Sequence, residues 1–338
     1  MSSLLISFNA IVPLFMIIAV GYLMKRLGVI GDTEVKRFNT ACFYTFMPVM
    51  LFYDVYTADL AGSVRPFFFI YTVGTILLLT LLTTLLVLKV EKDNSCRGVM
   101  IQAAFRSNFV LLGLPISTAL VGGGTSLGVT ALTIAIVVPL FNVMAVFILE
   151  AFRGGRVKPG TMLLNILKNP LIIGGLGGLL LKLLGVKLPQ FLLIFGGKME
   201  SGCFAIALFL LGASFEFKFL SDYKKDLILT VLLRLVIFPA LALTGAAVLG
   251  IRGVEFVTLI ALFAAPCAIN SFNMAMQMGG NKDLAASAVT QVSATRSLSL
   301  QYHMARLSVK GRLYLFHELV CQLIFIPSAS DPQNPARL

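Results

Sequence analysis

The chain has 338 residues, of which 58% are hydrophobic and only 12% are charged, and its mean hydropathy is +0.94. Globular chains carry about 25% charged residues, so this composition excludes a soluble domain and indicates an integral membrane protein. The net charge of +12 does not indicate a nucleic-acid-binding protein, because the basic residues cluster in short loops between apolar runs. The five cysteines show no C-x-x-C spacing, and the two histidines lie near the C-terminus, so we expect neither a metal centre nor a cofactor.

Apolar runs long enough to cross a bilayer recur along most of the chain. A spanning helix needs about 20 predominantly apolar residues. The runs predict nine spans and a tenth candidate, at 4–24, 38–57, 66–88, 98–121, 126–149, 170–186, 199–216, 227–249, 255–278 and 284–302. The predicted fold class is therefore an all-α membrane protein.

The lysines and arginines alternate between the loops. The odd-numbered loops hold most of them, whereas the even-numbered loops hold mainly Arg65, Lys187 and Arg252. The positive-inside rule then places the odd loops in the cytoplasm and both termini outside, if ten spans form. Five spans in each half is an odd number, so the halves insert in opposite orientations, as an inverted 5+5 repeat. We assign residues 1–150 to the first repeat, 151–169 to a cytoplasmic linker and 170–302 to the second, inverted repeat. The linker can carry a short interfacial helix.

The chain changes character after about residue 295. Polar residues interrupt the tenth candidate span, and 303–338 reads as an aberrant or disordered tail. One explanation is an amphipathic helix on the membrane surface followed by a short tail. Another is a shift of reading frame near codon 295 that replaced the native last span. The DNA sequence around that codon distinguishes the two.

The fourth and ninth expected spans are interrupted in their middles. The fourth contains Arg-Ser-Asn at 106–108 and Gly-Leu-Pro at 113–115, and the ninth contains Pro-Cys-Ala-Ile-Asn-Ser at 266–271. Hydrocarbon cannot satisfy freed backbone groups, so such a break is tolerated only inside protein or beside a watery cavity. A pair of broken spans in corresponding positions of two halves points to the substrate site of a secondary transporter.

The charges placed deep in the expected spans are positive. Arg106 lies roughly eight residues, or about 12 Å of helix, inside its span, and Arg234 is similarly placed in the eighth span. A charge at that depth is costly unless it is paired or hydrated, so both arginines are candidate site residues, although each could instead snorkel or bind neighbouring carbonyls. The acidic residues of the spans fall near the predicted span ends, at Asp54, Glu150, Glu200, Glu216 and Glu255. This distribution disfavours an intramembrane aspartyl protease and an antiporter built on buried aspartates.

The polar residues at the two breaks favour an anion. A broken helix exposes N–H groups at the start of its second half, where a negative charge is stabilised. Asn108 and Asn270 can add amide donors, Ser107 and Ser271 can add hydroxyls, and Asn142 in the fifth span either lines the site or packs. We therefore expect an organic anion, most simply a carboxylate. The alternative is a pair of proline kinks in which the asparagines join neighbouring helices.

Three segments resemble the auxin efflux carrier family. Arg-Ser-Asn-Phe-Val-Leu-Leu-Gly-Leu-Pro-Ile at 106–116 is similar to the motif of its fourth span, and Pro-Leu-Phe-Asn-Val at 139–143 to that of its fifth. Ala-Pro-Cys-Ala-Ile-Asn-Ser-Phe-Asn-Met-Ala at 265–275 resembles the crossover in its ninth span. The resemblance covers about residues 4–295, and the tail departs from the family pattern.

The resemblance implies broken fourth and ninth helices that cross at their prolines, and a scaffold domain of the first, second, sixth and seventh spans that is often dimeric. It places substrate beside the crossover, which corresponds here to Asn108, Pro115, Pro266 and Asn270. Bacterial members look like carriers of malate, malonate or related acids, while plant members export auxin and have a long middle loop that is short here, at 151–169.

These observations predict a secondary transporter of small organic anions that works by alternating access in the cell inner membrane. An intramembrane enzyme and an anion channel are the alternatives. The expected partners are the anion, the lipid bilayer and a second copy of the chain. H⁺ and Na⁺ are both candidate coupling ions, and nucleic acid is not expected as a partner.

Overall fold

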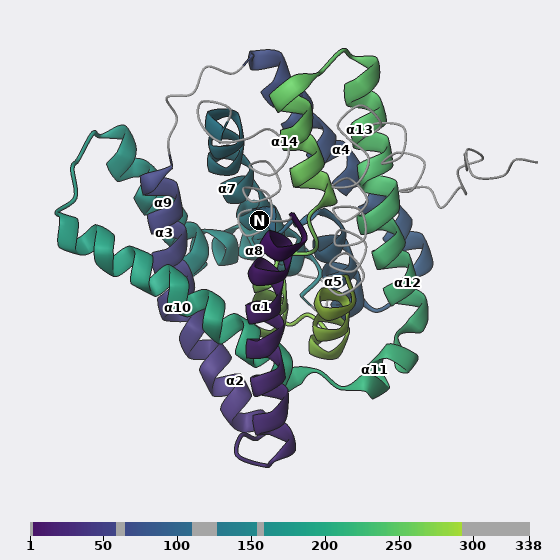
Figure 1. The fold of residues 1–338 in the computed structure, drawn as a ribbon. Coiled ribbons are helices and arrows are strands. Elements are labelled where there is room, and N and C mark those ends of the chain that lie inside the picture. Colours follow the sequence, from purple (N-terminus) through teal and green to yellow (C-terminus); the bar gives the residue numbers. More distant parts are fainter. Residues whose placement is uncertain (1–2, 59–64, 110–126, 154–158, 293–338) are drawn as a thin grey trace, which may run out of the picture.

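The computed structural model of the chain describes residues 3–58, 65–109, 127–153 and 159–292, and these ranges are helical almost throughout (Figure 1). The predicted all-α class is therefore confirmed. Two segments, α8 (Pro159–Leu167) and α9 (Pro170–Leu183), meet at 59° and together are apolar enough to form one bent span. Four further helices in the described ranges are long and apolar enough to cross a membrane, namely Pro66–Val90, Gly128–Ala151, Gln190–Ser214 and Lys224–Val248.

One group of helices occupies the left and lower parts of Figure 1. In this group α1 packs along α10, α3 packs along α9, and α3 also contacts α10. The short helix α2 runs directly through the π-helical turn η1 into α3. The members of the group are α1 (Ser3–Arg26), α2 (Asp32–Ala41), η1 (Cys42–Phe46), α3 (Met47–Thr57), α9 and α10 (Gln190–Ser214).

Glycine permits the two closest helix crossings of this group. A Cβ atom on Gly21 of α1 would overlap the backbone carbonyl of Phe209 in α10. Gly174 of α9 faces the backbone of Pro48 in α3 in the same way, and Gly178 follows one turn later. Membrane helices associate by such close backbone contact, since lipid supplies no hydrophobic drive toward the neighbouring helix.

A second group surrounds the two broken spans. Helix α5 packs against α4, α7 and α12, while α14 packs against α13 and α7. The segment α12–η3–α13 is continuous and contains a second π-helical turn, and α11 (Phe217–Asp222) leads into it. The members of this group are α4 (Pro66–Val90), α5 (Asn94–Phe105), α7 (Leu127–Ala151), α12 (Lys224–Leu232), η3 (Leu233–Ile237), α13 (Phe238–Val248), α14 (Gly253–Ala264) and α15 (Asn270–Gln277).

Some boundaries differ from those expected. Helix α10 begins at Gln190, directly after Pro189, so the prediction that the seventh span begins at 199 is wrong. The helix expected within 159–169 is present as α8. The tenth candidate span begins as a helix over 282–292. Its remainder and the tail at 303–338 lie outside the described residues.

Candidate functional site

The two broken spans pair through their backbones. Helix α5 ends at Phe105 and α14 ends at Ala264, and the chain after each helix is extended. The N–H of Asn108 donates to the carbonyl of Pro266 at 2.8 Å, and the N–H of Ala268 donates to the carbonyl of Arg106 at 3.1 Å. These bonds form an antiparallel bridge between Ser107 and Cys267. Backbone groups that the helix breaks leave free are thus satisfied by the opposite half of the chain.

Proline accounts locally for the break in the ninth span. Pro266 lacks an N–H and disfavours the helical conformation of the residue before it. Ala265 is accordingly extended, with φ −68° and ψ 147°, and the helix resumes at Asn270 as α15. The family resemblance implied that the two broken spans cross at their prolines. The carbonyl of Pro266 accepts a hydrogen bond at the crossing, while Pro115 lies outside the described residues.

Arg234 holds the ends of both half-helices. Its side chain is 1% exposed and rises from the π-helical turn η3. Its guanidinium donates five hydrogen bonds of 2.6–3.3 Å, to the carbonyls of Ala104, Phe105, Leu262 and Ala265. The C-terminal ends of helices carry unsatisfied carbonyls and partial negative charge, so one cation compensates both α5 and α14. The sequence left open whether Arg234 is a site residue, snorkels or binds neighbouring carbonyls, and in the structure its side chain binds carbonyls.

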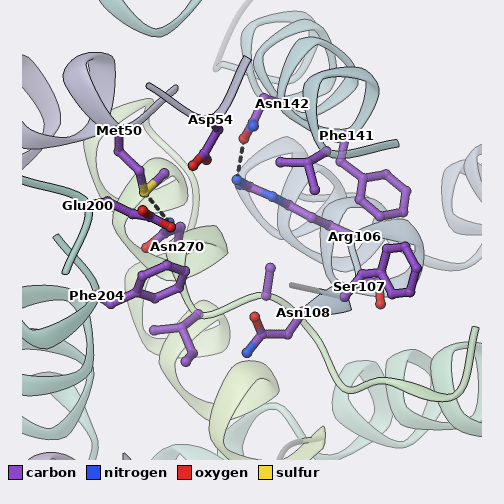
Figure 2. Close-up of a pocket in the computed structure, with 14 residues that line it drawn as sticks. Met50, Asp54, Arg106, Ser107, Asn108, Phe141, Asn142, Glu200, Phe204 and Asn270 are labelled. Atoms are coloured by element: carbon purple, nitrogen blue, oxygen red, sulfur yellow. Dashed lines mark hydrogen bonds between the residues drawn. The ribbon is translucent and has the colours of Figure 1, made fainter. Parts of the chain in front are cut away.

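A cavity of about 40 Å³ lies beside the crossing. Its walls come from α3 and α10 of the first group, and from the crossing, α7 and α15 of the second (Figure 2). One water needs about 10–15 Å³, so the cavity has room for a few waters. Binding of a larger molecule requires the two groups of helices to separate. The charged and amide side chains of its walls are Asp54, Arg106, Asn108, Asn142, Glu200 and Asn270.

Arg106 is a buried cation that has no carboxylate partner among the described residues. Its side chain is 4% exposed, and its guanidinium donates to Oδ1 of Asn142 and contacts the sulfur of Met274. Among the described residues, no carboxylate lies within ion-pair distance of it. The structure thus brings Arg106 and Asn142 together, 36 residues apart in the chain, on one wall of the cavity. A buried cation without a salt bridge favours a negative partner, so this wall can bind an anion.

Asn108 and Asn270 face the same cavity from the two broken spans. Both are buried, and Asn270 contacts the sulfur of Met50 through Nδ2 at 3.6 Å. The Oδ1 atom of Asn270 is buried with no hydrogen-bond donor in the described structure. Buried amide oxygens are normally paired, so this oxygen is available to a ligand.

Three other predicted residues take structural positions. The hydroxyl of Ser107 lines the cavity and donates to the carbonyl of Leu262 at 2.7 Å, so it joins the two breaks. Ser271 is buried behind the cavity, and its hydroxyl lies 3.6 Å from the sulfur of Cys267. Pro266 contributes its carbonyl to the crossing and does not line the cavity.

Two carboxylates of the cavity were missed by the sequence reasoning. Glu200 lies near the middle of the 25-residue helix α10, because that helix begins at Gln190. Asp54 projects from α3 on the same side of the cavity (Figure 2). The inference that the span acids all lie at span ends is therefore wrong for Glu200, and the site is not free of carboxylates. The apolar run 191–195 after Pro189 was the signal that α10 starts earlier.

The start of α5 is fixed by an acidic cap. Asp93 is exposed, and its carboxylate accepts a hydrogen bond from the N–H of Ser95 at 2.9 Å. That bond is the first cause of a pKa of Asp93 below the ordinary value, and the charge also suits the positive end of the helix. This cap sets where α5 begins, and so positions its far end at the crossing.

The sequence matches the family described as membrane transport protein over residues 6–303. It is similar to an uncharacterized transporter of Methanocaldococcus jannaschii, 24% identical over 276 residues, which cover 78% of this chain and 87% of the relative. An uncharacterized transporter of Methanothermobacter thermautotrophicus is 24% identical over 308 residues, covering 87% of this chain and 96% of the relative. With its paired broken spans and its apolar helices, the chain belongs to the membrane transport protein family, the family of the auxin efflux carriers.

Proposed function

We propose that this membrane transporter is a secondary carrier of small organic anions, such as malate, malonate or an auxin-like carboxylate. The observation that carries the proposal is Arg106, a buried cation at a cavity wall that pairs with an amide rather than with a carboxylate. A substrate carboxylate can accept hydrogen bonds from that guanidinium, and from Nδ2 of Asn108 on the same wall. The Oδ1 of Asn270 can accept from a hydroxyl of the substrate.

We further propose that the chain forms ten spans in two inverted repeats. The packing of the described helices supports this, because helix pairs that contact each other in one arrangement have counterparts at the equivalent positions of the other half. The pair α1–α10, the first and seventh expected spans, corresponds to α9–α3, the sixth and second. The pair α4–α5, the third and fourth, corresponds to α13–α14, the eighth and ninth. An inverted repeat produces this correspondence.

The position of the cavity between the two groups of helices supports alternating access. Asp54 and Glu200 belong to one group of helices, and Arg106, Asn142 and Asn270 to the other. The cavity of about 40 Å³ has room for a few waters, and we propose that the groups move apart to admit a substrate of three or four carbons. Rocking or sliding of one group against the other, opened to each side in turn, moves the anion across the membrane.

Counterflow in proteoliposomes tests the proposal against the channel and the enzyme. The full chain, reconstituted with unlabelled malonate inside, is expected to take up labelled malonate saturably and to accumulate it transiently. A channel gives flux without counterflow, and an enzyme changes the chemical identity of the label, which chromatography of the vesicle contents detects. Arg106→Gln is expected to remove the counterflow, while the exposed control Arg37→Gln retains it. Equal counterflow by both variants contradicts the assignment of Arg106.

The proposal also places the protein in the cell inner membrane, as a homodimer with both termini outside. An apolar groove of about 510 Å³ between α3, α9 and α10 supports the dimer. Beside it, α10 exposes Phe191, Ile194 and Phe195, which suits contact with lipid or a second copy. Cross-linking through a cysteine placed at Phe191 tests this, since a dimer across α10 is trapped and a monomer is not.

A further inference from the structure

Two carboxylates and an unpaired amide oxygen share one small cavity. Asp54 and Glu200 both line the space of about 40 Å³, and Asn270 lines it from the start of α15 (Figure 2). Asn270 is 4% exposed, and its Oδ1 has no donor in the described structure. No lysine or arginine of the described ranges lies within ion-pair distance of either carboxylate. The described residues thus give neither carboxylate a salt bridge and give Oδ1 of Asn270 no donor.

Two ionised carboxylates that line one small cavity repel each other, and because both are partly buried, water screens that repulsion less than at the surface. The usual resolution is a pair that retains a proton, as in aspartic protease dyads. A protonated carboxyl is also a donor, so it can bond to Oδ1 of Asn270 or to the other carboxylate. One proton thus removes the repulsion and supplies the missing donor.

The other charged and titratable groups near Asp54 and Glu200 do not form a salt bridge that could take the place of that proton. Arg106 lines the cavity from the crossing but is engaged by Asn142. Neither α7 nor α15 contributes a titratable side chain to the described part of the cavity walls. Among the described residues, the helices that carry the pair also hold Tyr53 of α3 and Cys203 of α10, whose sulfur lies 3.9 Å from that of Cys42 in η1. Lys182 of α9 donates to the carbonyls at the end of α3.

We propose that Asp54 and Glu200 form a proton-binding site that loads a proton together with the substrate anion. This inference rests on the proposed anion transport. With both carboxylates ionised, the walls carry two negative charges against the single positive charge of Arg106, which opposes an anion. A proton taken from water onto a carboxylate oxygen relieves that opposition, so anion and proton bind cooperatively, and each strengthens the binding of the other by the same factor.

The location of the pair accounts for release of the proton. Asp54 and Glu200 lie on the first group of helices, while Arg106 and Asn270 lie on the second. When the groups separate, the carboxylates are hydrated and lose the amide acceptor, so they return the proton to the water on that side. The anion, now facing the same water, leaves with it. The inference therefore predicts symport of anion and proton.

Infrared spectroscopy tests the proton site without any transport. Purified wild-type protein at neutral pH is expected to show the carbonyl stretch of a protonated carboxyl, which the Asp54→Asn, Glu200→Gln double variant lacks. The matched control Glu216→Gln, Asp222→Asn removes two exposed carboxylates and is expected to keep the band. A double-variant spectrum equal to that of the wild type overturns the inference, whether or not malonate is carried.

Proteoliposomes with the membrane potential clamped at zero test the coupling. An inward proton gradient is expected to accumulate labelled malonate by up to about tenfold per pH unit at one proton per anion. The double variant should lose this accumulation, and the control pair should keep it. Malonate flux that does not change with the proton gradient, or that depends on a sodium gradient, overturns the inference. The proposal of anion transport then still stands. No saturable flux under any gradient contradicts the proposed function instead, and the infrared result then decides the proton site.

Discussion

The backbone N–H of Asn108 donates to the carbonyl of Pro266, 2.8 Å away, and so joins the fourth and ninth expected spans at their breaks. Each residue belongs to a different half of the chain, and each break leaves backbone groups that the bilayer cannot satisfy. The two interruptions therefore stabilise one another. They also hold two asparagines, Asn108 and Asn270, at the wall of one cavity.

Replacing Arg234 is expected to destabilise the fold. Arg234→Met leaves four carbonyls at the ends of α5 and α14 without their donors. Loss of one partner from a buried charged network lowers stability by about 3–5 kcal/mol. Arg234→Lys keeps the charge but not the planar fork of donors, so it should recover only part of the loss. Thermal unfolding in detergent measures the effect against Arg37→Met, and equal midpoints for all variants contradict the capping role.

Replacing Arg106 is expected to weaken substrate binding and spare the fold. Arg106→Gln removes a buried charge that forms no salt bridge with a carboxylate of the described residues, so the unfolding midpoint should change little. A charge-assisted hydrogen bond is worth about 1.5–3 kcal/mol, so the half-saturating malonate concentration should rise by about ten- to a hundredfold. Initial rates of uptake over a range of malonate concentrations measure this. An unchanged half-saturation would show that substrate does not contact Arg106.

Adding one methyl group at a helix crossing tests the packing of the first group. Gly174→Ala places a Cβ against the backbone of Pro48, whereas Gly175→Ala on the same helix meets nothing within 4 Å. Overpacking of this kind destabilises by about 1–3 kcal/mol. We expect a lower unfolding midpoint for Gly174→Ala only. Equal midpoints for the two variants would argue against the close contact of α3 with α9.

The cap of α5 is expected to depend on pH. Asp93→Ala should lower stability by about 1 kcal/mol, because the N–H of Ser95 loses its acceptor. The folded pKa of Asp93 is depressed, so this contribution is present above the pKa of the unfolded chain and is lost as pH falls through the lower folded pKa. Asp93→Asn keeps an acceptor but does not titrate. Its unfolding midpoint should fall less steeply on acidification than that of the wild type, and parallel curves would contradict the assignment.

The breaks could be predicted from the sequence because proline and polar residues inside an apolar run are rarely compatible with an unbroken spanning helix. Local chemistry placed Asn108 and Pro266 at the two breaks, whereas the resemblance to the auxin efflux carrier family implied that the breaks meet at one crossing. The role of Arg234 could not be predicted in this way, because its partners are backbone carbonyls, and tertiary packing brings them from 28 to 130 residues away.

Glu200 was misplaced for a different reason. Lys198 and Glu200 interrupt the hydropathy of α10, so the apolar pattern predicts a span that starts beside them and assigns the carboxylate to its end. A charged residue in the middle of a spanning helix weakens the apolar pattern by which that helix is recognised. Functional residues inside membrane spans are therefore the ones that boundary prediction misplaces most readily.

Equilibrium binding of labelled malonate to the purified full chain tests the central claim most directly, because it asks whether the crossing holds an organic anion. We predict saturable binding that the Asn108→Ala, Asn270→Ala double variant loses. The control Gln190→Ala, at the exposed start of α10, should retain it. Wild-type affinity in the double variant would contradict the anion site at the crossing.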